Sequence, residues 1–276
     1  MSKAVCPLCL HHCALEEGEV GICRARIGRR GGVEPLYYGK LSALALDRVE
    51  KKPLRRFYPG RMVLSLGSFG CNLRCPFCQN HRIAQPDGAP VHWQEWTPQA
   101  LARRAAELAG RGNIGLAYTY NEPLVNYEFV RDCARAVRER GMANILVTNG
   151  TMEPEPWQAL LPLLDAVNID LKGFSAGWYR RLGGDVEVVR RAIAQAAARC
   201  HVEVTTLLIP GENDGEEEIR ALCRFLADIR PDIPLHLSRF FPHYRMRGRA
   251  ATPVETVYRL VEVAREYLTW VYPGNC

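Results

Sequence analysis

Six short apolar segments, separated by stretches of helical periodicity, shape the chain from residue 62 onward. Each has the length and the β-branched content that are typical of a parallel strand buried on both faces. Six strands, each followed by a helix, predict an α/β fold with a partial (β/α)6 barrel, short of the eight units in a complete barrel. An incomplete barrel leaves a lateral opening, which suits a bulky substrate. The six segments cover residues 62–68, 114–120, 143–148, 166–171, 202–209 and 234–240.

Helix signals follow the strand segments. Thr97-Pro98 predicts an N-cap followed by proline at the first helical position, and Thr252-Pro253-Val254-Glu255 predicts a capping box at the start of the last helix. Residues 1–60 have little regular pattern, so we expect a cysteine-rich N-terminal segment and lead-in over residues 1–60 and the barrel core over residues 61–276. Further helical patterns cover about residues 124–139, 155–164, 186–199 and 214–229.

The chain has eleven cysteines in 276 residues, and their clustering bears on both compartment and chemistry. No apolar run approaches the ~18 residues needed to span a bilayer, and the first residues lack the long apolar stretch of a signal peptide. We therefore expect a cytoplasmic protein without a membrane partner, in which disulfides are rare. Clustered thiols in a reducing compartment indicate bound metal. Two groups stand out: Cys6, Cys9, Cys13 and Cys23, and then Cys71, Cys75 and Cys78.

The second cysteine group lies on one short loop directly after the first predicted strand. Its spacing is C-x3-C-x2-C, from Cys71 through Cys75 to Cys78. Three thiolates can hold three irons of a [4Fe–4S] cube, and the fourth iron is then open to a small chelating molecule. A zinc site completed by His81 is the alternative. The glycine-flanked loop and the aromatic Phe77 before the third cysteine favour the iron–sulfur cluster.

The loop resembles the signature of the radical SAM superfamily, C-x3-C-x-aromatic-C after the first strand of a partial barrel. The resemblance implies two cofactors, a [4Fe–4S] cluster and S-adenosylmethionine (SAM), whose methionine part chelates the open iron. It also implies reductive cleavage of SAM to a 5′-deoxyadenosyl radical, which takes a hydrogen atom from the substrate. Phe77 and Asn80 are implied to contact SAM.

Polar residues at the ends of the next strands extend this resemblance, because active-site residues of βα barrels lie at the C-terminal ends of the strands. Glu122 falls in a segment similar to the family's Gly-Gly-Glu-Pro, with Tyr120-Asn121 in place of the glycines. We expect it to pair with the ammonium of SAM; an acid favoured by a helix N-terminus is the alternative. Asn149, Asp170 and Lys172 are expected to reach the ribose hydroxyls and the carboxylate of SAM, or else Asp170 and Lys172 form an ion pair across the barrel mouth.

The fifth and sixth strands supply further candidates. Pro210 and Gly211 follow the fifth strand, in a turn that resembles the family's turn under the adenine. His236 on the sixth strand is expected to contact the ribose or the substrate. A core histidine whose hydrogen bonds are satisfied is the alternative for His236.

Two subgroups of the superfamily share longer motifs with the chain. Glycyl-radical activating enzymes, such as pyruvate formate-lyase activating enzyme, share residues 148–150 and 170–172. They usually carry an aspartate that helps to bind a cation where this chain has Val147. The radical SAM enzyme of the AmmeMemoRadiSam system is similar over nearly the whole chain, including residues 49–54. These resemblances imply a protein or peptide substrate and a reductant such as flavodoxin or ferredoxin.

The first cysteine group has four thiols within 18 residues, with His11 and His12 among them. Four thiolates complete either a structural zinc site or a [4Fe–4S] cluster. A segment this small has too little core to fold without metal. We therefore expect bound metal, either zinc or an auxiliary cluster. The predicted ligands are Cys6, Cys9, Cys13 and Cys23.

Basic residues gather early in the chain, although the net charge of +6 is modest. A solvated face is the favoured interpretation, because few aromatic residues are interleaved with them. The alternative functions are an RNA-modifying radical SAM enzyme and a non-enzymatic, metal-dependent module that binds nucleic acid. We do not expect nucleic acid as a partner. The basic residues are Arg24, Arg26, Arg29, Arg30, Lys51, Lys52, Arg55, Arg56 and Arg61.

Overall fold

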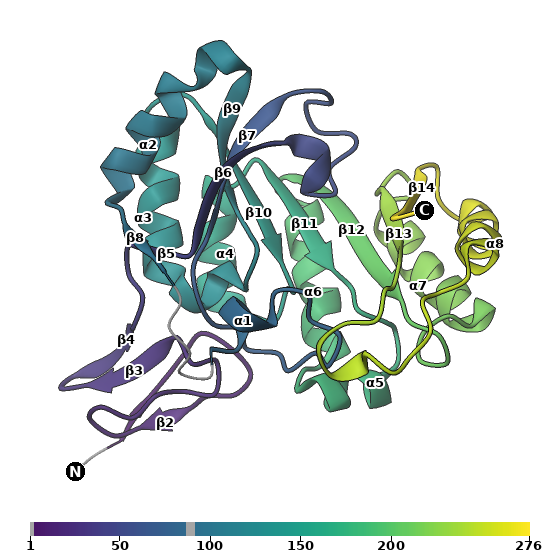
Figure 1. Ribbon diagram of the computed structural model, residues 1–276, viewed down its shortest axis with the longest axis horizontal. Helices are drawn as coiled ribbons and strands as arrows, with labels where there is room; N and C mark the ends of the chain where they lie inside the picture. Colours follow the sequence, from purple (N-terminus) through teal and green to yellow (C-terminus); the bar gives the residue numbers. More distant parts are fainter. Residues whose placement is uncertain (1–2, 87–91) are drawn as a thin grey trace.

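The computed structural model describes residues 3–86 and 92–276. Within these ranges the main feature is an eight-stranded curved sheet with the order β14-β13-β12-β11-β10-β9-β7-β6 (Figure 1). The six predicted strands are confirmed as the centre of this sheet, and neighbours among them run parallel. They are β7 (Met62–Gly67), β9 (Asn113–Tyr118), β10 (Ala143–Thr148), β11 (Ala166–Asp170), β12 (His201–Leu208) and β13 (Leu235–Arg239).

Two strands that the sequence did not predict form the edges of the sheet. β6 (Ala43–Arg48) pairs antiparallel with β7, and β14 (Val271–Gly274) pairs parallel with β13. In the described part of the chain these two strands end the sheet order without pairing with each other, so the barrel is open on this side. The partial barrel is therefore confirmed. Because β6 (Ala43–Arg48) belongs to the sheet, the sheet begins before residue 60. The division of the chain into two domains at that residue stays a prediction.

Helices follow the strands and pack on the outer face of the sheet (Figure 1). The predicted N-cap is confirmed, since the side chain of Thr97 accepts a hydrogen bond from the amide of Ala100. The predicted capping box is wrong: the last helix begins at Val254, and the hydroxyl of Thr252 donates to the carbonyl of Leu208 at 2.6 Å instead. The helices are α2 (Pro98–Glu107), α3 (Tyr127–Arg138), α4 (Pro154–Leu160), α5 (Ala176–Leu182), α6 (Val186–Ala197), α7 (Glu216–Ile229) and α8 (Val254–Arg265).

The N-terminal segment forms two small antiparallel hairpins, β1–β2 and β3–β4. Figure 1 shows them at the end of the sheet where α1 (His81–Ala84) lies, which is the end reached by the carboxyl ends of the parallel strands. The amide of Glu153 donates to the carbonyl of Leu8 there. The remaining short strands are β1 (Ala4–Val5), β2 (Ala14–Leu15), β3 (Arg26–Arg29), β4 (Gly32–Pro35), β5 (Lys40–Leu41) and β8 (Gln94–Glu95). The short 3-10 helices are η1 (Val49–Lys51), η2 (Ala109–Arg111), η3 (Pro123–Asn126), η4 (Leu161–Leu163) and η5 (Tyr244–Met246).

A small apolar core, separate from the main core between sheet and helices, lies beneath the second cysteine loop. Leu73 and Phe77 of the loop pack there against Ile209 and Phe240. The ring of Phe77 stacks on Trp178 of α5, with 5.9 Å between ring centroids. This packing holds the loop against the strand ends, so the backbone that carries the cysteines is fixed by apolar contacts.

Candidate active site

A pocket of about 360 Å³ opens at the carboxyl ends of the strands. Cys71, Cys75 and Cys78 all line it. The strands that precede the other predicted residues are neighbours in a parallel sheet, and their carboxyl ends therefore meet at one edge. Side chains far apart in the sequence come together in this way. The predicted residues that line the pocket beside the cysteines are Phe77, Asn80, Glu122, Asn149, Asp170 and Lys172.

The cysteine loop presents its thiols to this pocket from a well-anchored backbone. The amide of Arg74 donates to the carbonyl of Leu182 at the end of α5. The sulfur of Cys71 accepts hydrogen bonds from the amide of Leu73, at 3.4 Å, and from Nδ2 of Asn149, at 3.6 Å. Burial raises the pKa of the Cys71 thiol, and it raises the pKa of Cys75 to about 11. These thiols therefore keep their protons at neutral pH until a metal displaces them.

Glu122 is a buried carboxylate, 3% exposed, that ties the ends of two strands together. It accepts hydrogen bonds from the hydroxyl of Thr148 at 2.7 Å, from the amide of Asn149 at 2.8 Å and from the amide of Leu124 at 3.1 Å. Burial raises the pKa of Glu122 to about 7, although these hydrogen bonds act in the opposite direction. The bond to Leu124 is also an N-terminal cap of η3. The alternative interpretation of Glu122, an acid at a helix N-terminus, thus has a structural counterpart, and the same carboxylate lines the pocket, while its pairing with SAM stays a prediction.

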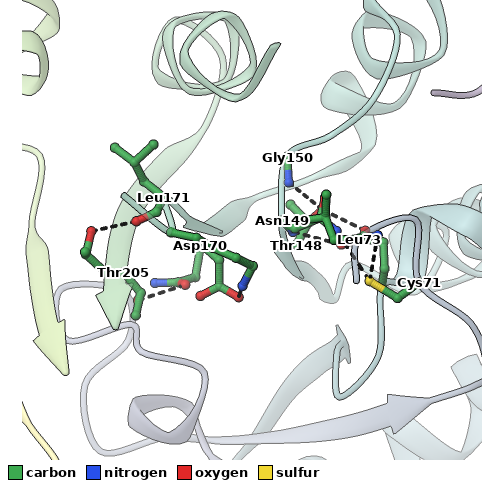
Figure 2. Close-up of polar contacts among 12 residues, drawn as sticks. Cys71, Leu73, Thr148, Asn149, Gly150, Asp170, Leu171 and Thr205 are labelled. Carbon is green, nitrogen blue, oxygen red and sulfur yellow. Dashed lines mark hydrogen bonds and ion pairs between the residues drawn. The ribbon is translucent and has the colours of Figure 1, made fainter. Parts of the chain in front are cut away.

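The side chain of Asn149 turns toward the cysteine loop, as Figure 2 shows. Its Nδ2 donates to Oδ1 of Asn72 at 2.9 Å as well as to Cys71. Its Oδ1 accepts from the amide of Thr151. Asn149 therefore joins the end of β10 to the loop that carries the thiols.

Asp170 and Lys172 form the ion pair that the sequence offered as an alternative, with 3.1 Å between Oδ2 and Nζ. Both side chains line the pocket, and Asp170 lies across from Asn149 and Cys71 in Figure 2. Burial alone would lower the pKa of Lys172, but the charge of Asp170 and the hydrogen bond that it accepts from Nζ raise it above its usual value. The ammonium is therefore a fixed positive charge at the pocket wall.

Three predicted residues lie elsewhere: among the residues that the structure describes as lining this pocket, Pro210, Gly211 and His236 are absent. The contact of His236 with the ribose or the substrate stays a prediction, and the position of the side chain favours the alternative. Its Nε2 lies 2.6 Å from Oε2 of Glu203, and its side chain is buried inside the barrel. This burial and this hydrogen bond are those expected of the alternative, a core histidine. The carbonyl of Pro210 accepts a hydrogen bond from Arg249, on the outer side of the turn.

Sequence reasoning missed a group of pocket residues beside β6. Lys52 and Tyr120 line the pocket, and both bind the carboxylate of Asp47, with Nζ at 2.8 Å and the phenol oxygen at 2.7 Å. Tyr120 has a φ of +71°, which is the left-handed conformation that favours glycine. In the resemblance noted from the sequence, Tyr120 takes the place of a glycine. That substitution, together with the shared motif at residues 49–54, was the signal that could have found the group.

Comparison with known proteins bears on the pocket as a whole. The family model of the radical SAM superfamily matches residues 66–226 of this chain. The matched range includes the cysteine loop and the pocket residues Glu122, Asn149, Asp170 and Lys172. The chain belongs to the radical SAM superfamily. A [4Fe–4S] cluster and SAM are the typical cofactors of radical SAM proteins. The three thiols on one loop fit a cluster of this kind, because they supply soft ligands for three irons and leave the fourth iron for SAM.

Two relatives illustrate the similarity at the level of sequence. An uncharacterised protein of Methanocaldococcus jannaschii, MJ0808, is 39% identical over 285 residues, which cover 99% of this chain and 82% of the relative. The pyruvate formate-lyase 1-activating enzyme of Escherichia coli K12 is 27% identical over 165 residues, which cover 58% of this chain and 66% of that enzyme.

Solved structures show the same radical SAM fold. A domain of a pyruvate-formate lyase-activating enzyme from Bacteroides vulgatus has a TM-score of 0.51 at 21% identity and covers 58% of this chain and 99% of that domain. Streptococcus suis SuiB bound to S-adenosylmethionine has a TM-score of 0.61 at 13% identity and covers 78% of this chain and 52% of SuiB. Within residues 3–86 and 92–276 of this chain, none of the helices has the length and apolar character that crossing a membrane requires.

Proposed function

We propose that the chain cleaves SAM reductively and uses the resulting 5′-deoxyadenosyl radical to abstract a hydrogen atom from a protein or peptide. In this it would act like glycyl-radical activating enzymes and the radical SAM enzyme of the AmmeMemoRadiSam system. One observation carries the proposal: Cys71, Cys75 and Cys78 line the same pocket as Glu122 and Lys172. A [4Fe–4S] cluster on the three thiolates would supply the electron that breaks a sulfur–carbon bond of SAM.

In this proposal Glu122 and Lys172 orient the methionine part of SAM through charge. Of the two carboxylate oxygens of Glu122, Oε2 accepts one hydrogen bond in the described structure, from the amide of Asn149, and so can accept another from the ammonium of SAM. A nearby ammonium also favours the ionised form of this carboxyl. Lys172 would pair with the carboxylate of SAM, and Asp170 would accept hydrogen bonds from the ribose. Phe77 and Asn80 would complete the wall around the cofactor.

The open side of the barrel supports a large substrate. Lys51, which follows β6, and Asn275, which follows β14, both line the pocket, so the pocket extends to the gap between the edge strands. A peptide could reach the site there without rearrangement of the sheet. The names of the relatives point to the same substrate class, because pyruvate formate-lyase activating enzymes are among them. A one-electron donor such as flavodoxin or ferredoxin would complete the reaction.

The early basic residues give little support to a nucleic-acid function. Arg26 is 3% exposed and donates to both carboxylate oxygens of Glu128. Lys52 is also 3% exposed and pairs with Asp47. Two members of the basic group are therefore committed to internal ion pairs, which removes them from any phosphate-binding face.

The test is SAM cleavage by protein reconstituted anaerobically with iron and sulfide and supplied with a strong reductant. We expect 5′-deoxyadenosine and methionine in equal amounts, and none from the Cys75→Ala variant. Cys133→Ala is the matched control, because Cys133 is buried in the main core outside this pocket. Absence of both products from wild type with a spectroscopically intact cluster would refute the proposal.

A further inference from the structure

The four early cysteines surround a second cavity, beside the cysteine loop of the pocket. Cys6 and Cys23 are each 5% exposed, so their thiols face the interior of the protein. Cys6 and Cys9 come from the β1–β2 hairpin, and Cys23 follows it before β3. The other walls combine apolar residues with Arg26, Asn72 and Thr151, and several of these residues come from outside the segment. These apolar residues are Leu8, Ile22, Leu124, Val125 and Met152.

The two histidines of this segment are engaged elsewhere. Nε2 of His11 lies 2.8 Å from the carbonyl oxygen of Asn72. Nε2 of His12 lies 3.2 Å from a carboxylate oxygen of Glu153. Neither histidine is among the residues that line the cavity in the described structure. The donor set at the cavity is therefore four cysteines.

Four thiolates can complete either a single zinc ion or a [4Fe–4S] cluster. Tetrahedral zinc needs all of its sulfurs about 2.3 Å from one point, whereas a [4Fe–4S] cube takes one thiolate at each iron. The place of the cavity favours the cluster. Asn72 of the loop that fits the family's cluster also lines this cavity, so a redox-active group here would lie beside another one.

The two cysteine sets are joined by direct hydrogen bonds. The amide of Cys71 donates to the carbonyl of Cys23 at 3.1 Å. Asn72 lines the cavity of the early cysteines, and its Oδ1 accepts from Asn149, which also donates to the sulfur of Cys71. Ligands of the two sites are thus neighbours through the backbone and through one pair of amide side chains. Clusters held at these sites would therefore be neighbours, since ligand residues of the two sites are in direct hydrogen-bond contact.

We infer that Cys6, Cys9, Cys13 and Cys23 hold a second [4Fe–4S] cluster that delivers electrons to the cluster at Cys71, Cys75 and Cys78. The delivery step rests on the proposed function, while the binding of a second cluster does not. A low-potential one-electron donor protein is oxidised by one electron and reduces the N-terminal cluster. The same electron then passes to the cluster in the pocket, and the N-terminal cluster returns to its oxidised state. No bond is formed or broken in this transfer.

The experiment measures iron, sulfide and zinc in the anaerobically reconstituted full-length chain, in the Cys71→Ala/Cys75→Ala/Cys78→Ala variant and in the Cys133→Ala control. By ligand counting we expect about eight irons per chain in wild type and in the control, and about four in the triple variant. Electron paramagnetic resonance of fully reduced wild type should show signals broadened by magnetic interaction between two clusters. The triple variant should show one unbroadened signal.

Each alternative result has a defined meaning. About four irons and one zinc in wild type would overturn the inference, and because wild type alone decides this, a folding defect in the variant does not matter. Two clusters without magnetic interaction would overturn electron delivery between them. Two interacting clusters without 5′-deoxyadenosine formation would instead contradict the proposed function and leave the second cluster in place.

Discussion

The carboxylate of Glu203 accepts a hydrogen bond from Nε2 of His236 across 2.6 Å inside the barrel. Glu203 is fully buried and also binds His201 and the backbone amides of Arg55 and Arg56. Burial alone would raise the pKa of Glu203, but these hydrogen bonds lower it to about 2. One carboxylate thereby fastens the segment after β6 to the centre of the sheet.

We predict that Glu203→Gln destabilises the fold in a pH-dependent manner. The folded-state pKa of Glu203 lies below its unfolded value, so its stabilisation is complete above about pH 4.5 and is lost as the pH falls toward 2. At pH 7 the free energy of unfolding should fall by about 3 kcal/mol, because each unit of pKa shift corresponds to about 1.4 kcal/mol. Urea unfolding at pH 7, 5 and 3 should show the same gap between wild type and variant at pH 7 and 5 and a narrower gap at pH 3.

The control for this experiment is Glu217→Gln. The side chain of Glu217 is 88% exposed in its ion pair with Arg220. Its loss should change the free energy of unfolding by less than about 0.5 kcal/mol at every pH. A gap for Glu203→Gln that stays constant with pH would show that the carboxylate charge is not the cause.

Asp47→Asn should be strongly destabilising, because it leaves the buried ammonium of Lys52 without its ion pair. Lys52 is 3% exposed and lies 2.8 Å from the carboxylate. Breaking a buried pair from one side costs about 3 to 5 kcal/mol. Lys51 lies 3.3 Å from the same carboxylate but is 69% exposed, so Lys51→Ala should cost less than about 1 kcal/mol. Similar losses for the two variants in urea unfolding would contradict this assignment.

Gly70→Ala should disrupt the contact between the N-terminal segment and the cysteine loop. Gly70 has a φ of +89°, and a Cβ there would lie 2.5 Å from that of Ala25 and 2.6 Å from the carbonyl oxygen of Cys23. Gly31 has a φ of +96° with open space around it. Gly31→Ala should therefore lower the free energy of unfolding by about 1 to 2 kcal/mol, through the strained backbone conformation alone. Gly70→Ala should lower it by about 1 to 3 kcal/mol more, because the added Cβ also overlaps its neighbours. Thermal unfolding compares the two, and equal melting temperatures would argue against close packing at Gly70.

Glu122→Gln should weaken SAM binding while leaving the cluster in place. The amide cannot supply a negative charge to an ammonium, and a hydrogen bond to a charged group contributes about 1.5 to 3 kcal/mol, or roughly a 10- to 150-fold change in affinity. Equilibrium binding of SAM and iron content measure the two effects separately. Glu155→Gln is the control, since Glu155 is an exposed acid in the first turn of α4. Unchanged affinity in Glu122→Gln would leave Glu122 with only its capping role.

Local patterns predicted the elements whose stability depends on neighbours in the sequence. The six central strands are continuous apolar runs, and Thr97 caps α2 through an amide three residues away. Thr252 has an equally good local pattern, but its hydroxyl bonds to Leu208, 44 residues away in the sequence. The edge strands β6 and β14 were missed because they depend on pairing with the sheet rather than on a local apolar pattern.

The site residues show the same division. Glu122, Asn149 and Asp170 were singled out because each follows a predicted strand, and all three line one pocket. They meet there because adjacent parallel strands end at one edge of the sheet. The position of His236 outside the lining of this pocket could not be predicted, because alternation along a strand gives the face of a residue and not its height in the barrel. It is the second residue of β13, whereas Ser238, two residues further along the same strand, lines the pocket.

The sequence by itself determined the alternating fold, the cysteine loop and the carboxyl and amide groups around it. These follow from residue spacing along one segment or from the regular geometry of parallel strands. Only the tertiary structure decided that Cys23 contacts Cys71, that Lys52 and Tyr120 share Asp47, and that Glu203 holds His236 in the interior. Each of these contacts joins segments far apart in the chain, so it depends on packing and buried hydrogen bonding that no local pattern encodes.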